Sequence, residues 1–241
     1  MASSCCAWRS RSRASILTWS SSAAPRPSPF GSLVVGTVPP LPPEWKPPTK
    51  PRTIVVERPV PQSTVLMALP GIARDDPDWY AAVVMNHVLG GGGQQSRLFA
   101  EVRDKRGLAY GVSTGLRTYK RAALMVISTA SANERVAEAI RVIRAELARM
   151  RTEGITQQEL ADAKTYLNGA LALSLDSSGS VAGLLQSLQI DGLSADHVTR
   201  RTALIDAVKL EDVRRVARRL LRDEAMTTVV VGKPVGVTAD P

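Results

Sequence analysis

The chain has 241 residues, of which 44% are apolar and only 4% aromatic, so it can form one domain whose core is built from aliphatic side chains. No apolar run approaches the roughly 20 residues that cross a bilayer, which excludes a predicted membrane span. The net charge is +9, but residues 1–52 hold seven Lys and Arg against a single acidic residue, Glu44. The basic total therefore does not predict a nucleic-acid surface on the folded part.

Residues 1–52 are expected to form a low-complexity, disordered segment and a linker. Residues 1–30 are rich in Ser, Arg and Ala and hold no acidic residue, as in a transit peptide, but they lack the apolar stretch of a secretory signal. A truncated or misread start is the interpretation that we favour. Seven prolines in residues 37–52 predict an extended linker. The compartment stays open between the cytoplasm and the periplasm of a bacterium.

From residue 53 the pattern becomes that of a folded domain. Residues 53–60 and 63–69 are rich in β-branched side chains and predict two strands. Residues 76–89 predict a helix, with Asp75 or Asp76 as N-cap and Pro77 in the first turn.

Four glycines, Gly90, Gly91, Gly92 and Gly93, follow this helix. A phosphate-binding P-loop would follow a strand and end in Gly-Lys-Ser/Thr, and this run does neither. We interpret it as a flexible hinge that lets backbone approach backbone closely.

Residues 96–110 carry the most information. They predict a short amphipathic helix, a glycine turn and the start of a strand, with Arg103 at the helix end and Tyr110 at the strand start. A guanidinium and a phenol placed in this way can converge on one amide carbonyl. The alternative is a solvated arginine favoured by the helix dipole and a half-buried strand tyrosine.

In the rest of the chain, the predicted strands and helices occur in groups and do not alternate. Residues 109–119 and 122–131 predict a hairpin, and residues 133–151 an amphipathic helix capped by Asn133. Further helices are predicted over residues 156–175, 180–191, 195–208 and 210–221, before a last strand over residues 226–231. This order predicts an α+β fold with a mainly antiparallel sheet of about five strands and helices packed on one face. The arginines of residues 210–222 predict a solvated basic face, with an acidic partner or a membrane surface as the alternative.

These motifs resemble one known family. The segments 86–93, 96–99 and 103–110, followed by 159–164 and 227–232, are similar to the C-terminal, zinc-free domain of the pitrilysin/insulinase zinc metallopeptidases. The resemblance covers residues 53–234 and leaves 235–241 as a tail, and Phe30-Gly31-Ser32-Leu33 resembles what is left of the family domain's opening. It implies that Arg103 and Tyr110 face a zinc site and help to hold the substrate backbone.

Zinc peptidases of this family carry His-x-x-Glu-His on a helix. The two histidines here, His87 and His197, each lack a second histidine one helical turn away, and His87 is interpreted as a packed helix residue or one that interacts with the helix dipole. The adjacent Cys5 and Cys6 supply only half a zinc site. We therefore expect no metal or other cofactor on this chain and zinc on a partner.

The predicted function is that of a substrate-binding half-enzyme. It would hold an extended peptide along a sheet edge and complete the active site of a zinc-bearing domain or subunit, while being inactive alone. The alternative is a non-catalytic structural or assembly subunit with the same fold. Nucleic-acid binding would rest on charge only and is not expected.

Overall fold

The computed structural model describes residues 36, 37 and 39–241. The predicted transit-like or misread segment and Phe30-Gly31-Ser32-Leu33 lie outside these residues. The chain divides into two units, residues 1–41 and 42–241, and the fold is that of the second unit.

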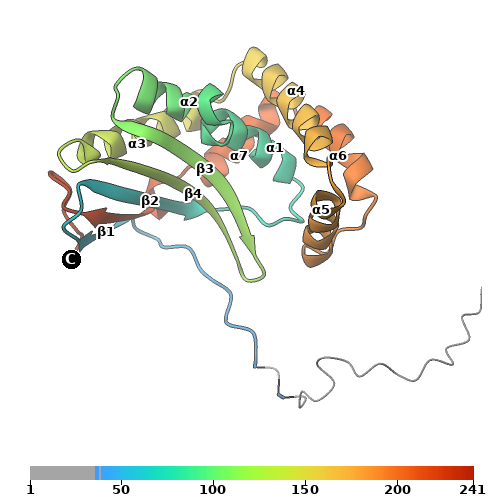
Figure 1. The fold of residues 1–241 in the computed structure, drawn as a ribbon, viewed down its shortest axis with the longest axis horizontal. Coiled ribbons are helices and arrows are strands. Elements are labelled where there is room, and N and C mark those ends of the chain that lie inside the picture. Colours follow the sequence, from blue (N-terminus) through green and yellow to red (C-terminus); the bar gives the residue numbers. More distant parts are fainter. Residues whose placement is uncertain (1–35, 38) are drawn as a thin grey trace, which may run out of the picture. The chain divides into compact units, whose positions relative to one another are not determined.

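In the part of the chain that the structure describes, five strands form one sheet, drawn as a twisted layer in Figure 1. Its order is β1-β5-β2-β4-β3, and among these strands only β1 and β5 pair in parallel. The mainly antiparallel α+β fold expected from the sequence is thus confirmed. The strands are β1 (Arg52–Glu57), β2 (Gln62–Pro70), β3 (Ala109–Tyr119), β4 (Ala122–Ala132) and β5 (Thr227–Gly232).

The helices pack on one face of the sheet (Figure 1). Strand β2 shows this through its alternation, because Val65, Met67 and Leu69 are buried while the residues between them are not. The longer helices are α1 (Trp79–Asn86), α3 (Val136–Glu153), α4 (Gln157–Ser174), α5 (Ser178–Ile190), α6 (His197–Asp206) and α7 (Leu210–Leu220). The described residues contain no helix that is long and apolar enough to cross a membrane.

Short helical turns connect α1 to β3. They are η1 (His87–Gly91), η2 (Gly93–Gln95), α2 (Arg97–Phe99) and η3 (Ala100–Asp104). A further short turn, η4 (Asp223–Ala225), lies between α7 and β5. Both η1 and η3 are π-helical turns. Such turns are often found at functional sites.

The two edges of the sheet differ. At the β1 edge, the backbone N–H of Asp240 donates to the Thr53 carbonyl (2.9 Å), so residues near the C-terminus run beside this strand. At the opposite edge, β3 has no neighbouring strand on its outer side within the described part of the chain. Strand β3 is therefore the edge with backbone groups open to pairing.

Two predicted helix caps are wrong. The first helix starts at Trp79 with Asp78 in the N-cap position, and Asp76 instead accepts a hydrogen bond from the Asp78 N–H (2.9 Å). Helix α3 follows Arg135 rather than Asn133. The Asn133 amide is used elsewhere, because it accepts from the Ser63 hydroxyl (2.6 Å) and donates to the Val60 carbonyl (2.9 Å).

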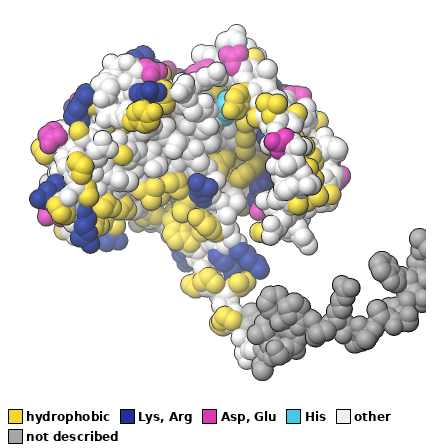
Figure 2. Space-filling model, in the orientation of Figure 1, with side chains coloured by type: hydrophobic (Ala, Val, Ile, Leu, Met, Phe, Trp, Pro, Cys, Tyr) yellow, Lys and Arg dark blue, Asp and Glu magenta, His cyan; other side chains and the backbone are white. Residues whose placement is uncertain are grey.

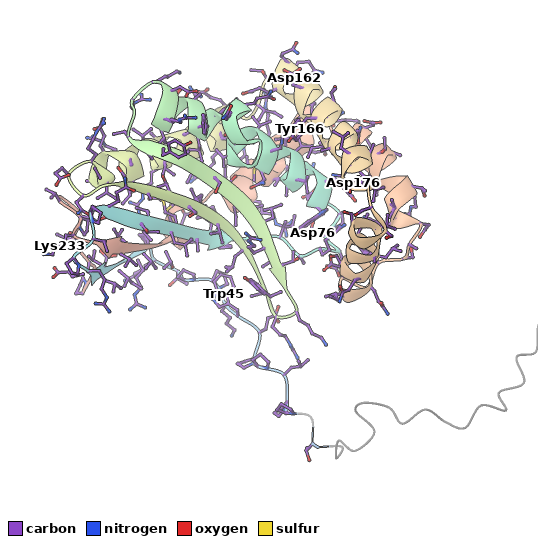
Figure 3. All side chains as sticks on the ribbon, viewed as in Figure 1. Trp45, Asp76, Asp162, Tyr166, Asp176 and Lys233 are labelled. Carbon is purple, nitrogen blue, oxygen red and sulfur yellow. The ribbon has the colours of Figure 1, made fainter. Side chains whose placement is uncertain are left out.

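The predicted basic face of α7 is partly paired. Arg219 donates to Asp76 (2.7 Å) and Arg215 to Asp78 (2.6 Å), which ties α7 to the segment before α1; Figure 3 shows Asp76 there. The hydrogen bond from Arg219 is the largest factor that lowers the pKa of the Asp76 carboxyl. On the face drawn in Figure 2, basic and acidic side chains are interspersed.

Candidate substrate-binding site at the start of strand β3

The turn that carries Arg103 is closed by its own backbone. Gly107 adopts a φ of 55°, which favours glycine, and its N–H donates to the Arg103 carbonyl (2.8 Å). The Leu108 N–H donates to the Val102 carbonyl (2.8 Å), a helix ending that is one residue wider than a Schellman motif because the last turn is π-helical. Arg135 braces the turn from outside, donating to the Gly107 carbonyl (2.9 Å).

A β-bulge directs Tyr110 outward. Ala109 pairs with Ser131 and Val112 with Thr129, so two residues of β3, Tyr110 and Gly111, oppose one residue of β4. A bulge of this kind shifts the alternation of the strand and re-aims a side chain. The Tyr110 side chain is 88% exposed as a result.

Two hydroxyls of β4 support the bulge. The Ser131 hydroxyl donates to the Leu108 carbonyl (2.6 Å), and the Thr129 hydroxyl donates to the Gly111 carbonyl (2.8 Å). Both hydroxyl-bearing residues are buried, so these bonds fix the backbone on either side of Tyr110.

Arg103 and Tyr110 meet. The guanidinium carbon of Arg103 lies 5.1 Å from the centre of the Tyr110 ring and 4.7 Å from the centre of the Phe99 ring. Cation–π contacts at these distances are worth about 0.5–1 kcal/mol each at exposed sites. Arg103 and Tyr110, which the sequence predicts to converge, are therefore in contact with each other.

The charge of Arg103 is not neutralised by a neighbouring carboxylate. Glu101, on the same turn, forms ion pairs with Lys105 and Arg106 instead (2.6 Å each). These hydrogen bonds, that from Lys105 first, lower the pKa of the Glu101 carboxyl. Within the part of the chain that the structure describes, Arg103 has no ion pair and its guanidinium donates to no side chain.

Arg97 anchors the helix that presents this site. It donates to both carboxylate oxygens of Glu159 on α4 (2.6 and 2.7 Å), to the Gly154 carbonyl (3.1 Å), and to Glu146 on α3 (3.5 Å). Burial would raise the pKa of Glu159, but the hydrogen bonds from Arg97 and Thr156 outweigh it and lower that pKa. Burial also raises the pKa of Glu146, and here Arg149 and Arg97 offset it only in part.

The glycine run packs closely against its neighbours. A side-chain carbon at Gly90 would lie 2.6 Å from the Thr114 methyl group on β3, and one at Gly92 would lie 2.8 Å from the His87 carbonyl. Gly90 therefore allows η1 to approach β3 closely, and Gly92 allows the chain to pass close to His87 at the end of η1. Movement of Gly90, Gly91, Gly92 and Gly93 as a hinge stays a prediction.

The two histidines occupy separate elements and do not fit a zinc site. His87 is buried and stacks on Tyr166 of α4 (ring centres 4.7 Å apart; Tyr166 is labelled in Figure 3), and burial lowers its pKa. The packed role expected for His87 is what the structure shows. His197 lies against Tyr80 (2.6 Å) and Arg74 (3.1 Å). In the described residues no three His, Cys, Asp or Glu side chains are grouped as metal ligands.

Sequence reasoning did not single out Phe99, Arg97 as an anchor, or the bulge. The Phe99–Arg103 contact could have been found from the spacing of four residues within a predicted helix. The bulge could not, because it depends on the register of β3 against β4.

Comparison with known proteins places the chain in a family. The family profile described as "Peptidase M16 inactive domain" matches residues 20–167. The chain belongs to this family, the pitrilysin/insulinase-type peptidases that its motifs resemble.

Relatives carry the same assignment. A Streptomyces coelicolor protein named as an uncharacterized zinc protease is 31% identical over 182 residues, which is 74% of this chain and 39% of that protein. A Bacillus subtilis protein with the same description is 30% identical over 165 residues, 68% of this chain and 40% of that protein. The chain thus spans about two fifths of the length of these relatives.

Solved structures agree. The peptidase M16 inactive domain from Pseudomonas fluorescens has a TM-score of 0.74 at 29% identity, covering 86% of this chain and 48% of that one. A protease from Helicobacter pylori has a TM-score of 0.74 at 25% identity, covering 84% and 50%. The chain therefore has the fold of an inactive M16 domain of zinc-protease-like proteins.

Proposed function

We propose that this chain is the substrate-binding, zinc-free half of an M16 metallopeptidase. It holds an extended peptide and completes the active site of a zinc-bearing partner domain or subunit. The observation that carries the proposal is the meeting of the Arg103 guanidinium with an 88% exposed Tyr110 at the start of an open edge strand.

The open edge of β3 suits a stretched peptide. Pairing through the main chain gives affinity with little demand on the peptide sequence. The β1 edge is less suited, because residues near the C-terminus already bond to it at Thr53. Strand β3 spans Ala109–Tyr119, so a bound peptide would lead toward Tyr110 at its start.

Arg103 and Tyr110 supply complementary donors for one carbonyl. The guanidinium brings a fixed positive charge with several N–H donors, and Tyr110 brings a neutral O–H donor. Together they would orient the peptide bond and stabilise negative charge that develops on its oxygen. The zinc of the partner would supply the metal chemistry, and the residues of this chain would bind and orient.

Peptide binding tests the first half of the proposal. The full chain should bind a synthetic, unstructured 20-residue peptide weakly, and Arg103→Ala should weaken that binding at least about tenfold, because hydrogen bonds to a charged group are worth about 1.5–3 kcal/mol. Fluorescence anisotropy of a labelled peptide measures it. Arg218→Ala, which removes an exposed arginine of α7 outside the proposed site, is the matched control and should bind as the parent does.

Turnover tests the second half. The zinc-bearing partner can be supplied as the part of the Streptomyces coelicolor relative that this chain does not match. Tyr110→Phe should then lower peptide turnover at least about tenfold, as the loss of one transition-state donor does. Unchanged turnover would remove Tyr110 from the mechanism.

A structural or assembly role is the second candidate. The family profile is described as an inactive domain, which fits a subunit without chemistry. Such a subunit has no need of peptide binding. A chain that folds, ignores the peptide and is unaffected by Arg103→Ala would favour this role.

A further inference from the structure

We propose that Phe99 is the positioning residue of this site and that it sets Arg103, and through Arg103 the Tyr110 ring, for a peptide carbonyl. The inference deepens the proposed function and rests on it. Phe99 lies one helical turn before Arg103, and the guanidinium carbon lies 4.7 Å from the centre of its ring. Tyr110 takes the other contact at 5.1 Å.

The three side chains differ in how firmly they are held. Phe99 is only 8% exposed, and its helical neighbours Leu98 and Val102 are fully buried. Tyr110 is 88% exposed, so it cannot itself fix the position of a guanidinium. Arg97 holds the same helix to α3 and α4 through Glu146 and Glu159. Of the two rings that contact Arg103, that of Phe99 is therefore held by the fold, whereas that of Tyr110 is exposed to solvent.

An aromatic support leaves the donors of Arg103 available. A carboxylate that orients an arginine accepts its N–H bonds, whereas a ring face attracts the cation through its quadrupole and occupies none of its in-plane donors. Glu101, on the same turn, is paired with Lys105 and Arg106 rather than with Arg103. The two ring contacts thus orient Arg103 without a carboxylate that would accept its N–H groups.

Binding of the synthetic 20-residue peptide to the full chain tests the role of Phe99. Phe99→Leu keeps an apolar side chain but removes the ring, and it should weaken binding about two- to fivefold, the factor of one exposed cation–π contact. Phe99→Tyr keeps an aromatic ring at this position and should bind the peptide with the parent affinity. Val102→Ala is the matched control, because it removes buried volume from the same turn without removing either ring that contacts Arg103; it should lose stability and keep the affinity.

The Arg103 side chain can be observed directly and without a peptide. The Nε–Hε signal of Arg103, assigned by its loss in Arg103→Lys, should be shifted by the ring currents of the two aromatic neighbours. Phe99→Leu should move this signal toward that of a solvated arginine, whereas Phe99→Tyr and Val102→Ala should leave it close to the parent position. General destabilisation would not produce this pattern.

The two measurements separate the possible failures. An unchanged Arg103 signal and unchanged affinity in Phe99→Leu would overturn the role of Phe99, even where Arg103→Ala abolishes binding. Unchanged affinity in Arg103→Ala would overturn the proposed function, whatever the Arg103 signal does in Phe99→Leu. A shifted signal together with the two- to fivefold loss supports the inference.

Discussion

At the scale of single residues, the candidate site depends on side chains that hold their neighbours as well as on those that face solvent. Arg97 is the clearest example, since one guanidinium contacts two carboxylates and a carbonyl from α3, α4 and the loop between them. Its partners lie 49 and 62 positions away in the sequence. Local sequence pattern carries no information on such long-range contacts. The sequence therefore predicted Arg103 as a site residue but did not predict that Arg97 anchors the helix that carries it.

Removal of Arg97 should destabilise the fold. Arg97→Ala leaves Glu146, whose side chain is 4% exposed, and Glu159 without their shared cation, and breaking such a buried pair costs about 3–5 kcal/mol. The half-exposed Arg151, which pairs with the exposed Glu224 (3.9 Å), gives the control, because Arg151→Ala should cost about 1 kcal/mol or less. Urea unfolding followed by circular dichroism measures both. Equal losses in the two variants would contradict the anchoring role of Arg97.

At the scale of secondary-structure elements, most of the fold was predictable and its local adjustments were not. The alternation of β2 and the apolar stripe of α3 are strong periodic signals, and both elements lie where the sequence predicts them. The bulge at Tyr110 and Gly111 was not predicted, because it follows from pairing with β4. Asn133 was misassigned as a cap for the same reason: its partners Ser63 and Val60 come from a distant segment.

The contact between α6 and α1 should respond to acid. His197 opens α6, and its Nε2 lies 3.1 Å from an Arg74 nitrogen, which can only donate, so Nε2 must be unprotonated there. The Tyr80 hydroxyl shares this nitrogen, Asp191 pairs with Arg74, and Arg201 faces the same cluster. Burial, followed by the charges of Arg74 and Arg200, lowers the pKa of His197.

Stability should therefore fall as the pH drops below about 6.5, the ordinary pKa of histidine. A histidine whose folded pKa is lowered binds fewer protons than in the unfolded chain, so its contribution is present at neutral pH and is lost in acid. His87 acts in the same direction. Because the chain has two histidines, single His→Asn variants assign both imidazole signals in an NMR titration. Folded pKa values at or above about 6.5 would contradict the prediction.

At the scale of the whole molecule, the chain spans about two fifths of the length of the relatives that it matches, and no group of metal ligands is found among residues 36, 37 and 39–241. The fold and the meeting of Arg103 with Tyr110 could be predicted because both depend on patterns within this chain. The partner could not be predicted, since no residue of this sequence identifies the molecule that would carry the zinc. Under the proposed function, turnover would belong to the pair and not to this chain alone.

Metal removal separates the contribution of this chain from that of its partner. A chelator should abolish peptide turnover by the reconstituted pair, because under the proposed function the partner would hold the metal that lowers the barrier to attack on the peptide bond. The same chelator should leave peptide binding by this chain alone unchanged, since the proposed binding groups, Arg103, Tyr110 and the edge of β3, would need no metal. Anisotropy and turnover measured side by side at one chelator concentration test both statements. A loss of binding by the isolated chain would place a metal within its own peptide site and contradict the division of roles.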